Sequence, residues 1–384
     1  MPPQAVCLSI RAMSRNTMYK NLLRASVSTL IAAGAAFTTP ALLAADGAAA
    51  KPPLKVAFVY VSPVGTAGWT YQHNMGRLAM ESKLGAAVQT TYVENVAEGP
   101  DSERVMRDLA GQGYQLIFAT SFGYLEPALK VAQEFPKVAF EHMGGHKTAA
   151  NVNSYNARFY EGRYLAGYLA GRMSKTGVTG YVAGFPIPEV IQGINAYTLG
   201  MRAANPKAQV KVTWLNTWFD PAKERDAALA LLGQGADTLT HHSGSTAIPQ
   251  LAEEKGVMLL GYQSDMRHIA PTAQLTSVTH VWGERYTQVA QAVAAGRWKP
   301  QPYWAGLRQG VIKMAPLAKT VPADVEHQFR ERERAIAMGK LHPFGGKLVD
   351  QDGRVRQSGG SMADAGIARM DFFVQGVVGS LPKP

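Results

Sequence analysis

The sequence predicts an α/β fold with two doubly wound lobes, each built around a parallel sheet. The 384-residue chain is long enough for two domains, since a domain commonly holds about 100–200 residues. Its hydrophobic share of 46% and charged share of 17% are those of a globular protein. Short apolar runs rich in β-branched and aromatic residues alternate with helical stretches, and this alternation starts again near the middle of the chain.

The first 50 residues are expected to be a cleaved export signal and not part of the fold. Basic residues between 11 and 24 occur without an acid, and an apolar run over 25–37 and an alanine-rich stretch follow. This order is typical of a secretory signal, and the apolar run is too short to span a bilayer. Cys7 precedes the apolar run, so it cannot be a lipidated lipoprotein cysteine. We therefore expect a periplasmic protein, with a retained signal anchor as the alternative.

The net charge of +11 on the whole chain does not indicate nucleic-acid binding. Without residues 1–50 the chain has 35 Lys and Arg against 27 Asp and Glu, which is a net charge of +8. These basic residues are scattered, with no run longer than two, and Glu331-Arg332-Glu333-Arg334 mixes both signs. The same part contains no cysteine, which excludes thiol catalysis, iron–sulfur clusters and disulfides there and fits an oxidising compartment.

The first half is expected to form one parallel sheet with its helices. Leu54–Val61 is a β-rich apolar run, typical of a buried parallel strand, and Ser62-Pro63-Val64-Gly65 ends it. Asp101 and Ser102 can cap a helix that has Glu103 in its first turn. The expected strands are 54–61, 88–93, 116–120, 138–141 and 152–155, and the expected helices are 69–84, 101–110 and 128–134.

The second half repeats the alternation and is expected to form a second parallel sheet. Its first helix, 161–173, carries small residues such as Gly162, Ala166 and Gly167 on one face. The expected strands are 178–183, 210–215, 238–240 and 257–260, and the further helices are 191–205, 221–232 and 248–255. Two successive βαβ series predict two lobes that face each other across a cleft.

Candidate ligand contacts follow the strands, because doubly wound sheets bind ligands beyond the carboxyl ends of their strands. Aromatic residues recur at these positions in both halves, among them Trp69, Phe122, Trp218 and Phe219. An aromatic ring offers a large flat surface at low entropic cost. The pattern predicts a flat ligand held between rings, and for any single ring the alternative is packing between the lobes.

The sequence lacks the motifs of the common enzyme classes. It contains no phosphate-binding loop, no dinucleotide fingerprint after the first strand, no nucleophile elbow and no HExxH motif. The adjacent His241 and His242 would point to opposite sides of a strand, so a metal site is not expected. Glu141 beside His142 could be an acid–base pair, but no nucleophile accompanies them. We expect no enzymatic activity, no cofactor and no metal.

Four stretches in order resemble the basic membrane protein family of ABC transporter substrate-binding proteins, which bind purine nucleosides or bases. They are Phe159–Gly171, Trp218–Glu224, Gln234–Asp237 and Asp371–Pro382, and the resemblance extends over nearly all of 54–382. It implies a type I periplasmic-binding-protein fold whose lobes are joined by a three-strand hinge, with crossovers near Asn156, Gln263 and Arg308. The implied division is 54–156 with 264–308 for the N-terminal lobe and 157–263 with 309–384 for the C-terminal lobe.

The resemblance also implies a site in which a purine is stacked between two aromatic residues. The first corresponds to Trp69 and the second to Trp218 or Phe219, while the acid at the base edge corresponds to Glu141 or His142. A glycine-rich turn corresponds to 241–244, and later strand-end acids fall near Gln263 and Asp265. The full expected ligand-binding set is Trp69, Thr70, Phe122, Glu141, His142, Asn156, Trp218, Phe219, His242, Gln263, Asp265 and Trp282.

Two departures from the family pattern point to a free base. Ser62-Pro63-Val64-Gly65 stands where nucleoside binders of the family carry an acid, and His280, followed by Trp282, replaces a lysine associated with the ribose. We therefore expect an adenine-like nucleobase, with a nucleoside as the alternative ligand. The expected partner is an ABC permease in the inner membrane, and the protein is expected to be a monomer that binds no nucleic acid. A ligand sensor for a membrane receptor or kinase and a secreted nucleoside hydrolase are the alternative functions.

Overall fold

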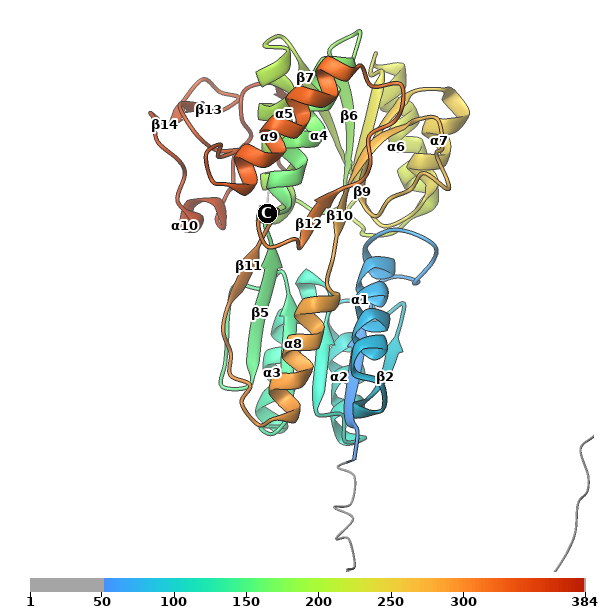
Figure 1. Cartoon of the computed structure of the whole chain (residues 1–384), viewed down its shortest axis with the longest axis vertical. Helices are drawn as coiled ribbons and strands as arrows, with labels where there is room; N and C mark the ends of the chain where they lie inside the picture. The colour runs from blue at the N-terminus through green and yellow to red at the C-terminus, as the bar shows by residue number, and fades with distance from the viewer. Residues whose placement is uncertain (1–51, 383–384) are drawn as a thin grey trace, which may run out of the picture. The chain divides into compact units, whose positions relative to one another are not determined.

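The computed structural model describes residues 52–382, so the expected export signal lies outside the described residues. This part of the chain contains a six-stranded sheet, a seven-stranded sheet and a small two-stranded pair. The two larger sheets, each covered by helices, confirm the predicted α/β class (Figure 1). We call the residues around the six-stranded sheet the first lobe and those around the seven-stranded sheet the second lobe. Over 52–382, no helix is both long and apolar enough to cross a membrane.

The first lobe is a parallel sheet with helices on both faces. Its strands, in spatial order, are β11 (Tyr303–Ala305), β5 (Val152–Ala157), β4 (Ala139–Met143), β3 (Leu116–Ala119), β1 (Leu54–Val59) and β2 (Val88–Val93). Its helices are α1 (Trp69–Leu84), α2 (Pro100–Gly111), α3 (Leu125–Glu134) and α8 (Gly283–Ala294), and short 3₁₀ turns occupy Gly85–Ala87 and Phe122–Tyr124. All neighbouring strands pair in parallel.

Alternation along β1 explains why both faces of this sheet are covered. Val56 and Phe58 belong to the core cluster that includes Tyr286 of α8, whereas Ala57 and Val59 belong to the cluster that includes Met106 of α2. Successive side chains of a strand point to opposite faces, so the continuous apolar run from Val56 to Val59 requires helices on both sides.

The second lobe has the same design with an antiparallel strand at one edge. Its strands, in spatial order, are β12 (Ile312–Met314), β10 (Gln274–His280), β9 (Met258–Gln263), β8 (Thr238–His242), β6 (Val178–Ala183), β7 (Gln209–Trp214) and β15 (Val377–Val378). Its helices are α4 (Phe159–Met173), α5 (Pro188–Ala204), α6 (Pro221–Gly233), α7 (Ala247–Lys255), α9 (Ala323–Ala337) and α10 (Asp364–Ile367). Only β12 pairs antiparallel in this sheet, and the separate pair is β13 (Leu348–Val349) with β14 (Val355–Gln357).

The small residues of α4 allow α5 to approach it very closely. A methyl group at Gly167 would lie 1.9 Å from the Tyr197 carbonyl oxygen, and one at Gly200 would lie 2.0 Å from that of Tyr164. These distances are well inside van der Waals contact, so a side chain at either glycine would force the helices apart. Of the small residues predicted on one face of 161–173, Gly167 thus packs against α5, whereas Gly162 packs against Val278 of β10 and Ile312 of β12.

The chain passes between the lobes after β5, between β10 and α8, and between β11 and β12. The second of these passages differs from the expectation. It was placed near Gln263, but residues 274–280 pair with β9 in the second sheet, so the chain crosses only after His280. The strand Gln-Leu-Thr-Ser-Val-Thr-His has only two apolar residues, Leu275 and Val278, and it therefore lacks the apolar run that predicts the other strands. The other residue boundaries of the two expected lobes remain predictions.

Candidate functional site

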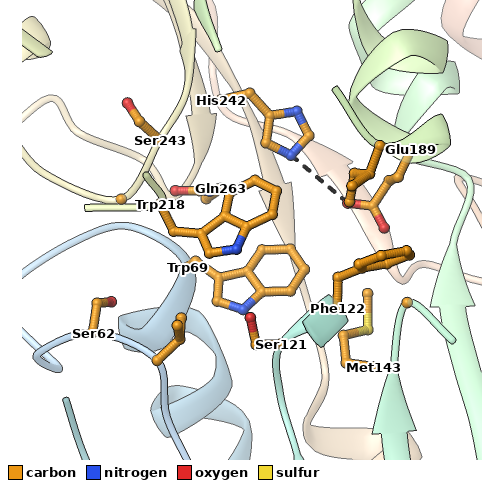
Figure 2. Close-up of a pocket in the computed structure, with 14 residues that line it drawn as sticks. Ser62, Trp69, Ser121, Phe122, Met143, Glu189, Trp218, His242, Ser243 and Gln263 are labelled. Atoms are coloured by element: carbon orange, nitrogen blue, oxygen red, sulfur yellow. Dashed lines mark ion pairs between the residues drawn. The ribbon is translucent and has the colours of Figure 1, made fainter. Parts of the chain in front are cut away.

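A pocket lies where carboxyl ends of strands from both sheets meet, which is the position at which doubly wound sheets bind ligands (Figure 2). The space between its walls, about 490 Å³, includes volume that is open to solvent. Its walls are formed by Val61, Ser62, Trp69, Ser121, Phe122, Met143, Gly144, Ile187, Glu189, Trp218, His242, Ser243, Gly244 and Gln263.

Trp69 is the aromatic wall contributed by the first lobe. It is the first residue of α1, and its indole N–H donates to the Thr120 carbonyl oxygen at 2.7 Å. The ring also meets the edge of His73, with centroids 4.7 Å apart. The hydrogen bond and the ring contact fix the half-buried indole in one orientation, so little conformational entropy is lost when a ligand stacks on it.

Trp218 is the aromatic wall contributed by the second lobe, from the loop after β7. A methyl group at Gly184 would lie 2.6 Å from a Trp218 ring carbon, so the ring rests directly on that glycine. Phe185 meets the ring at 66° with centroids 4.9 Å apart. The indole N–H donates to Glu98 of the first lobe at 3.2 Å. Trp69 and Trp218 thus line one pocket from two different lobes (Figure 2).

Glu189 is the carboxylate of the pocket. It occupies the first turn of α5 and is only 11% exposed. Burial raises its pKa to about 7, and a hydrogen bond from Asn156 and the charge of Arg163 partly oppose the rise. A carboxyl group with this pKa is partly ionised and partly protonated near neutral pH. It can accept a hydrogen bond from a ligand when ionised and donate one when protonated.

His242 faces Glu189 across the pocket, with Nε2 3.7 Å from the carboxylate (Figure 2). Burial and the charge of Arg163 hold the pKa of His242 well below its ordinary value. The imidazole is therefore neutral at neutral pH, and the contact does not neutralise Glu189 as an ion pair would. Glu189 is left without a cationic partner in the pocket wall.

Two buried polar atoms of the pocket residues have no hydrogen-bond partner within the described part of the chain. They are Nδ1 of His242 and Oε1 of Gln263. A buried polar atom without a partner costs about 1–3 kcal/mol, which a polar ligand atom can offset. Gln263 also has a φ of 72°, a left-handed conformation that is uncommon for a residue with a side chain and is found at functional sites.

Of the expected ligand contacts, the structure brings five into the pocket: Trp69, Phe122, Trp218, His242 and Gln263. Asn156 lines an adjoining hollow that shares Phe122, Gly144 and Glu189 with the pocket. Between the two second-lobe alternatives, Trp218 lines the pocket, whereas Phe219 lies beside Gly244 and does not.

Glu141 and His142 are not among the pocket-lining residues, because β4 extends two residues further than expected. Glu141 is completely buried, and its carboxylate accepts from Arg285 at 3.1 Å and from the Trp298 indole at 2.9 Å. Nε2 of the buried His142 hydrogen-bonds to the Ser121 carbonyl oxygen at 2.8 Å. The strand reaches the pocket only at its end, through Met143 and the following glycine.

Thr70, Asp265 and Trp282 also lie outside the pocket lining, and each has a partner elsewhere. The Thr70 hydroxyl bonds to that of Ser62 at 2.7 Å, and Asp265 pairs with the neighbouring Arg267. Trp282 is 1% exposed and stacks on His73 with centroids 5.4 Å apart.

Sequence reasoning missed Glu189. The predicted site relies on the aromatic residues that follow the strands, and after β6 that residue is Phe185, with Glu189 further along the chain. Pro188-Glu189 is a helix-start signal, since proline and an acid both favour the first turn. Because the helix that starts there begins at a strand end, the signal could have placed Glu189 at the cleft.

For a metal, the described residues 52–382 offer no cluster of three or more His, Asp or Glu.

Comparison with known proteins agrees with this architecture. The chain is 47% identical over 347 residues to a purine-binding protein of Brucella abortus, covering 90% of this chain and 99% of that protein. It is 35% identical to a putative ABC transporter glucose-binding protein of Haloferax volcanii, covering 86% and 82%. A solved ABC transporter solute-binding protein of Aeropyrum pernix has the same fold, with a TM-score of 0.65, 20% identity and coverage of 75% and 92%. The family model described as ABC transporter substrate-binding protein, PnrA-like, matches residues 54–340, and the chain belongs to that family.

Proposed function

We propose that the protein captures a free purine base, adenine-like in its hydrogen bonding, for an ABC importer. The observation that carries the proposal is the pair of indoles, Trp69 and Trp218, that line one pocket from two lobes. Aromatic rings stack well on flat heterocycles. A ligand that stacks on both rings contacts both lobes, so its binding favours the closed cleft. The name of the Brucella relative, a purine-binding protein, supports the same ligand class.

The polar groups of the pocket suit an uncharged heterocycle with both donors and acceptors. Ionised Glu189 would accept an N–H of the base, and the free Oε1 of Gln263 would accept another or an exocyclic amino group. His242 would meet the ring edge through its unpartnered Nδ1. The pocket lining contains no Lys or Arg, so nothing there would compensate a phosphate, and nucleotides are disfavoured.

The packing around Trp69 supports a base over a nucleoside. His280, which stands where the family pattern has a ribose-associated lysine, is 1% exposed and has its ring centroid 4.4 Å from that of Phe159 and 5.7 Å from that of Trp69. This aromatic cluster fills space next to the stack. A nucleoside would have to place its sugar in the adjoining hollow beyond Glu189, so it is the alternative outcome.

In this proposal the protein works outside the cytoplasmic membrane as a monomer and delivers its ligand to a permease. The signal-like segment over residues 1–50 and the absence of cysteine from the rest of the chain support export. Family membership supports the permease as the partner.

Isothermal titration calorimetry tests the proposal with adenine, hypoxanthine, adenosine, guanosine and glucose. The protein is first unfolded and refolded to remove any retained ligand. We expect a base to bind with micromolar or tighter affinity and every nucleoside to bind more weakly. A nucleoside that binds more tightly than both bases would contradict the free-base assignment, and glucose binding without any purine binding would overturn the purine class.

A further inference from the structure

We propose that Glu98, which is not a pocket-lining residue, is a positioning residue that ties the Trp218 ring of the second lobe to the Phe122 segment of the first lobe. The inference rests on the proposed function only for the ligand that is used in its binding test. Glu98 lies in the loop between β2 and α2 of the first lobe, and three donors converge on its Oε1. Two of these donors belong to the first lobe and one belongs to the second.

The two donors from the first lobe hold the carboxylate in place. The Ser121 hydroxyl donates at 2.6 Å and the Gly123 backbone N–H at 2.8 Å. A methyl group at Gly123 would lie 2.4 Å from the carboxyl carbon of Glu98, so only glycine lets the carboxylate lie this close to the backbone. These two residues flank Phe122, which lines the pocket, so Glu98 also braces that segment of the wall.

The third donor comes from across the cleft. The indole N–H of Trp218 donates to the same oxygen at 3.2 Å, while the faces and edges of that ring are set by Gly184 and Phe185 of its own lobe. A hydrogen bond to an ionised acceptor is roughly twice as strong as a neutral one. The first lobe thereby fixes the direction in which the second lobe's ring points, and this contact requires the lobes to be close together.

A second polar contact between the lobes lies elsewhere in the same cleft. The Gly68 backbone N–H donates to the Ser264 hydroxyl at 2.9 Å, and a methyl group at Gly68 would lie 2.5 Å from the Gly244 carbonyl oxygen. This contact brings the Gly68 backbone against the Ser264 hydroxyl and the Gly244 carbonyl, and it involves no ligand-stacking ring. The Glu98–Trp218 bond differs because it acts on a ring of the site, so its loss should alter ligand retention.

The test is a double-mutant cycle between Glu98→Ala and Trp218→Phe, read by stopped-flow kinetics of adenine binding. Phenylalanine keeps an aromatic face and removes the N–H donor. We expect Glu98→Ala to weaken binding about tenfold, mainly through faster dissociation, because the bond stabilises the arrangement in which the two lobes are close together. In the W218F background the same substitution should cost less than about threefold. Equal penalties in both backgrounds would overturn the proposal.

Glu94→Gln is the matched control, since Glu94 is the first residue of the same loop and, among residues 52–382, its side chain hydrogen-bonds only to the Val64 backbone N–H, at 2.8 Å. Its affinity should stay within about twofold of the wild type. An equal loss in Glu94→Gln and Glu98→Gln would mean that the net charge matters and not the contact, and would overturn the proposal.

A readout without ligand separates this proposal from the proposed function. The chain has six tryptophans, so a nitrogen–proton NMR spectrum shows up to six indole N–H signals, and the signal lost in Trp218→Phe identifies Trp218. Glu98→Gln should shift this signal more than any other indole signal, in the ligand-free protein and after ligand addition. If no purine binds but the shift is seen, the contact stands and the ligand assignment fails. An unmoved Trp218 signal would overturn the contact itself.

Discussion

The first lobe buries a carboxylate at Glu141 and the second lobe buries one at Glu189, and the two have opposite surroundings. Glu141 has a guanidinium, an indole N–H and the Asn153 amide as donors. Glu189 has one amide and a neutral imidazole, and burial raises its pKa to about 7. Burial alone therefore does not identify a ligand-binding acid. A paired acid stabilises the fold, whereas an acid without a cationic partner at a pocket can take a ligand as its partner.

The largest effect expected from this comparison is on folding. Glu141→Ala leaves Arg285, whose side chain is 15% exposed, without its partner and removes the acceptor of Trp298. Breaking a buried pair by removing one member costs about 3–5 kcal/mol of unfolding free energy. Urea denaturation monitored by circular dichroism should show this loss. If the free energy of unfolding fell by less than about 1 kcal/mol, Glu141 would not have the structural role assigned to it.

The next effect is on ligand stacking. Trp69→Ala should weaken adenine binding by more than about tenfold, because it removes one of the two rings that line the pocket. Phe219→Leu is the control, since Phe219 lies outside the pocket lining, and its affinity should change by less than about twofold. Calorimetry measures both. If Phe219→Leu weakened binding as strongly as Trp69→Ala, Trp218 would not be the second stacking residue.

Glu189→Gln should weaken adenine binding by about tenfold while leaving the free energy of unfolding unchanged or slightly higher. The amide cannot offer an ionised acceptor, but it also avoids the desolvation of a carboxylate. Calorimetry and urea denaturation on the same preparation separate the two consequences. The comparison with Glu141 fails if the substitution destabilises the fold and leaves adenine affinity intact.

The smallest expected effect is a pH dependence that Glu189 brings to binding. The folded, ligand-free protein holds the Glu189 proton more tightly than the unfolded chain does, so the contribution of this group to stability falls as pH rises from 4.5 to about 7. A ligand N–H requires the ionised form, so adenine affinity should rise severalfold from about pH 6 to pH 8. The other groups facing Glu189 are Asn156, the neutral His242 and the positively charged Arg163.

The control for this pH dependence is the Glu189→Gln protein, in which the adenine affinity should be flat over the same range. A wild-type affinity that does not change with pH, or an equal slope in Glu189→Gln, would show that the base does not donate to an ionised Glu189.

The sequence predicted the sheet-forming parts of the molecule better than it predicted the polar site. Apolar runs such as Leu54–Val59 identify buried parallel strands without tertiary information, and the aromatic residues after strands led to Trp69, Phe122 and Trp218. The mostly polar strand over 274–280 gives no such signal, because its identity as a strand depends on pairing with β9.

The choice between the acids could not be made from sequence, because it depends on strand length. Extending β4 by two residues moves Glu141 from the strand end into the interior beside Arg285. The start of α5 then places Glu189 at the pocket, although the two acids are 48 positions apart in the sequence. Such placements follow from how strand ends and helix starts from different segments meet in space.

The measurement that tests the central claim most directly is native mass spectrometry of the freshly purified protein, followed by identification of what unfolding releases. The two indoles and the uncompensated Glu189 predict one bound molecule per chain with the mass of a purine base. A bound nucleoside would keep the stacking site but contradict the free-base assignment. A bound sugar in the absence of any purine would contradict the account as a whole.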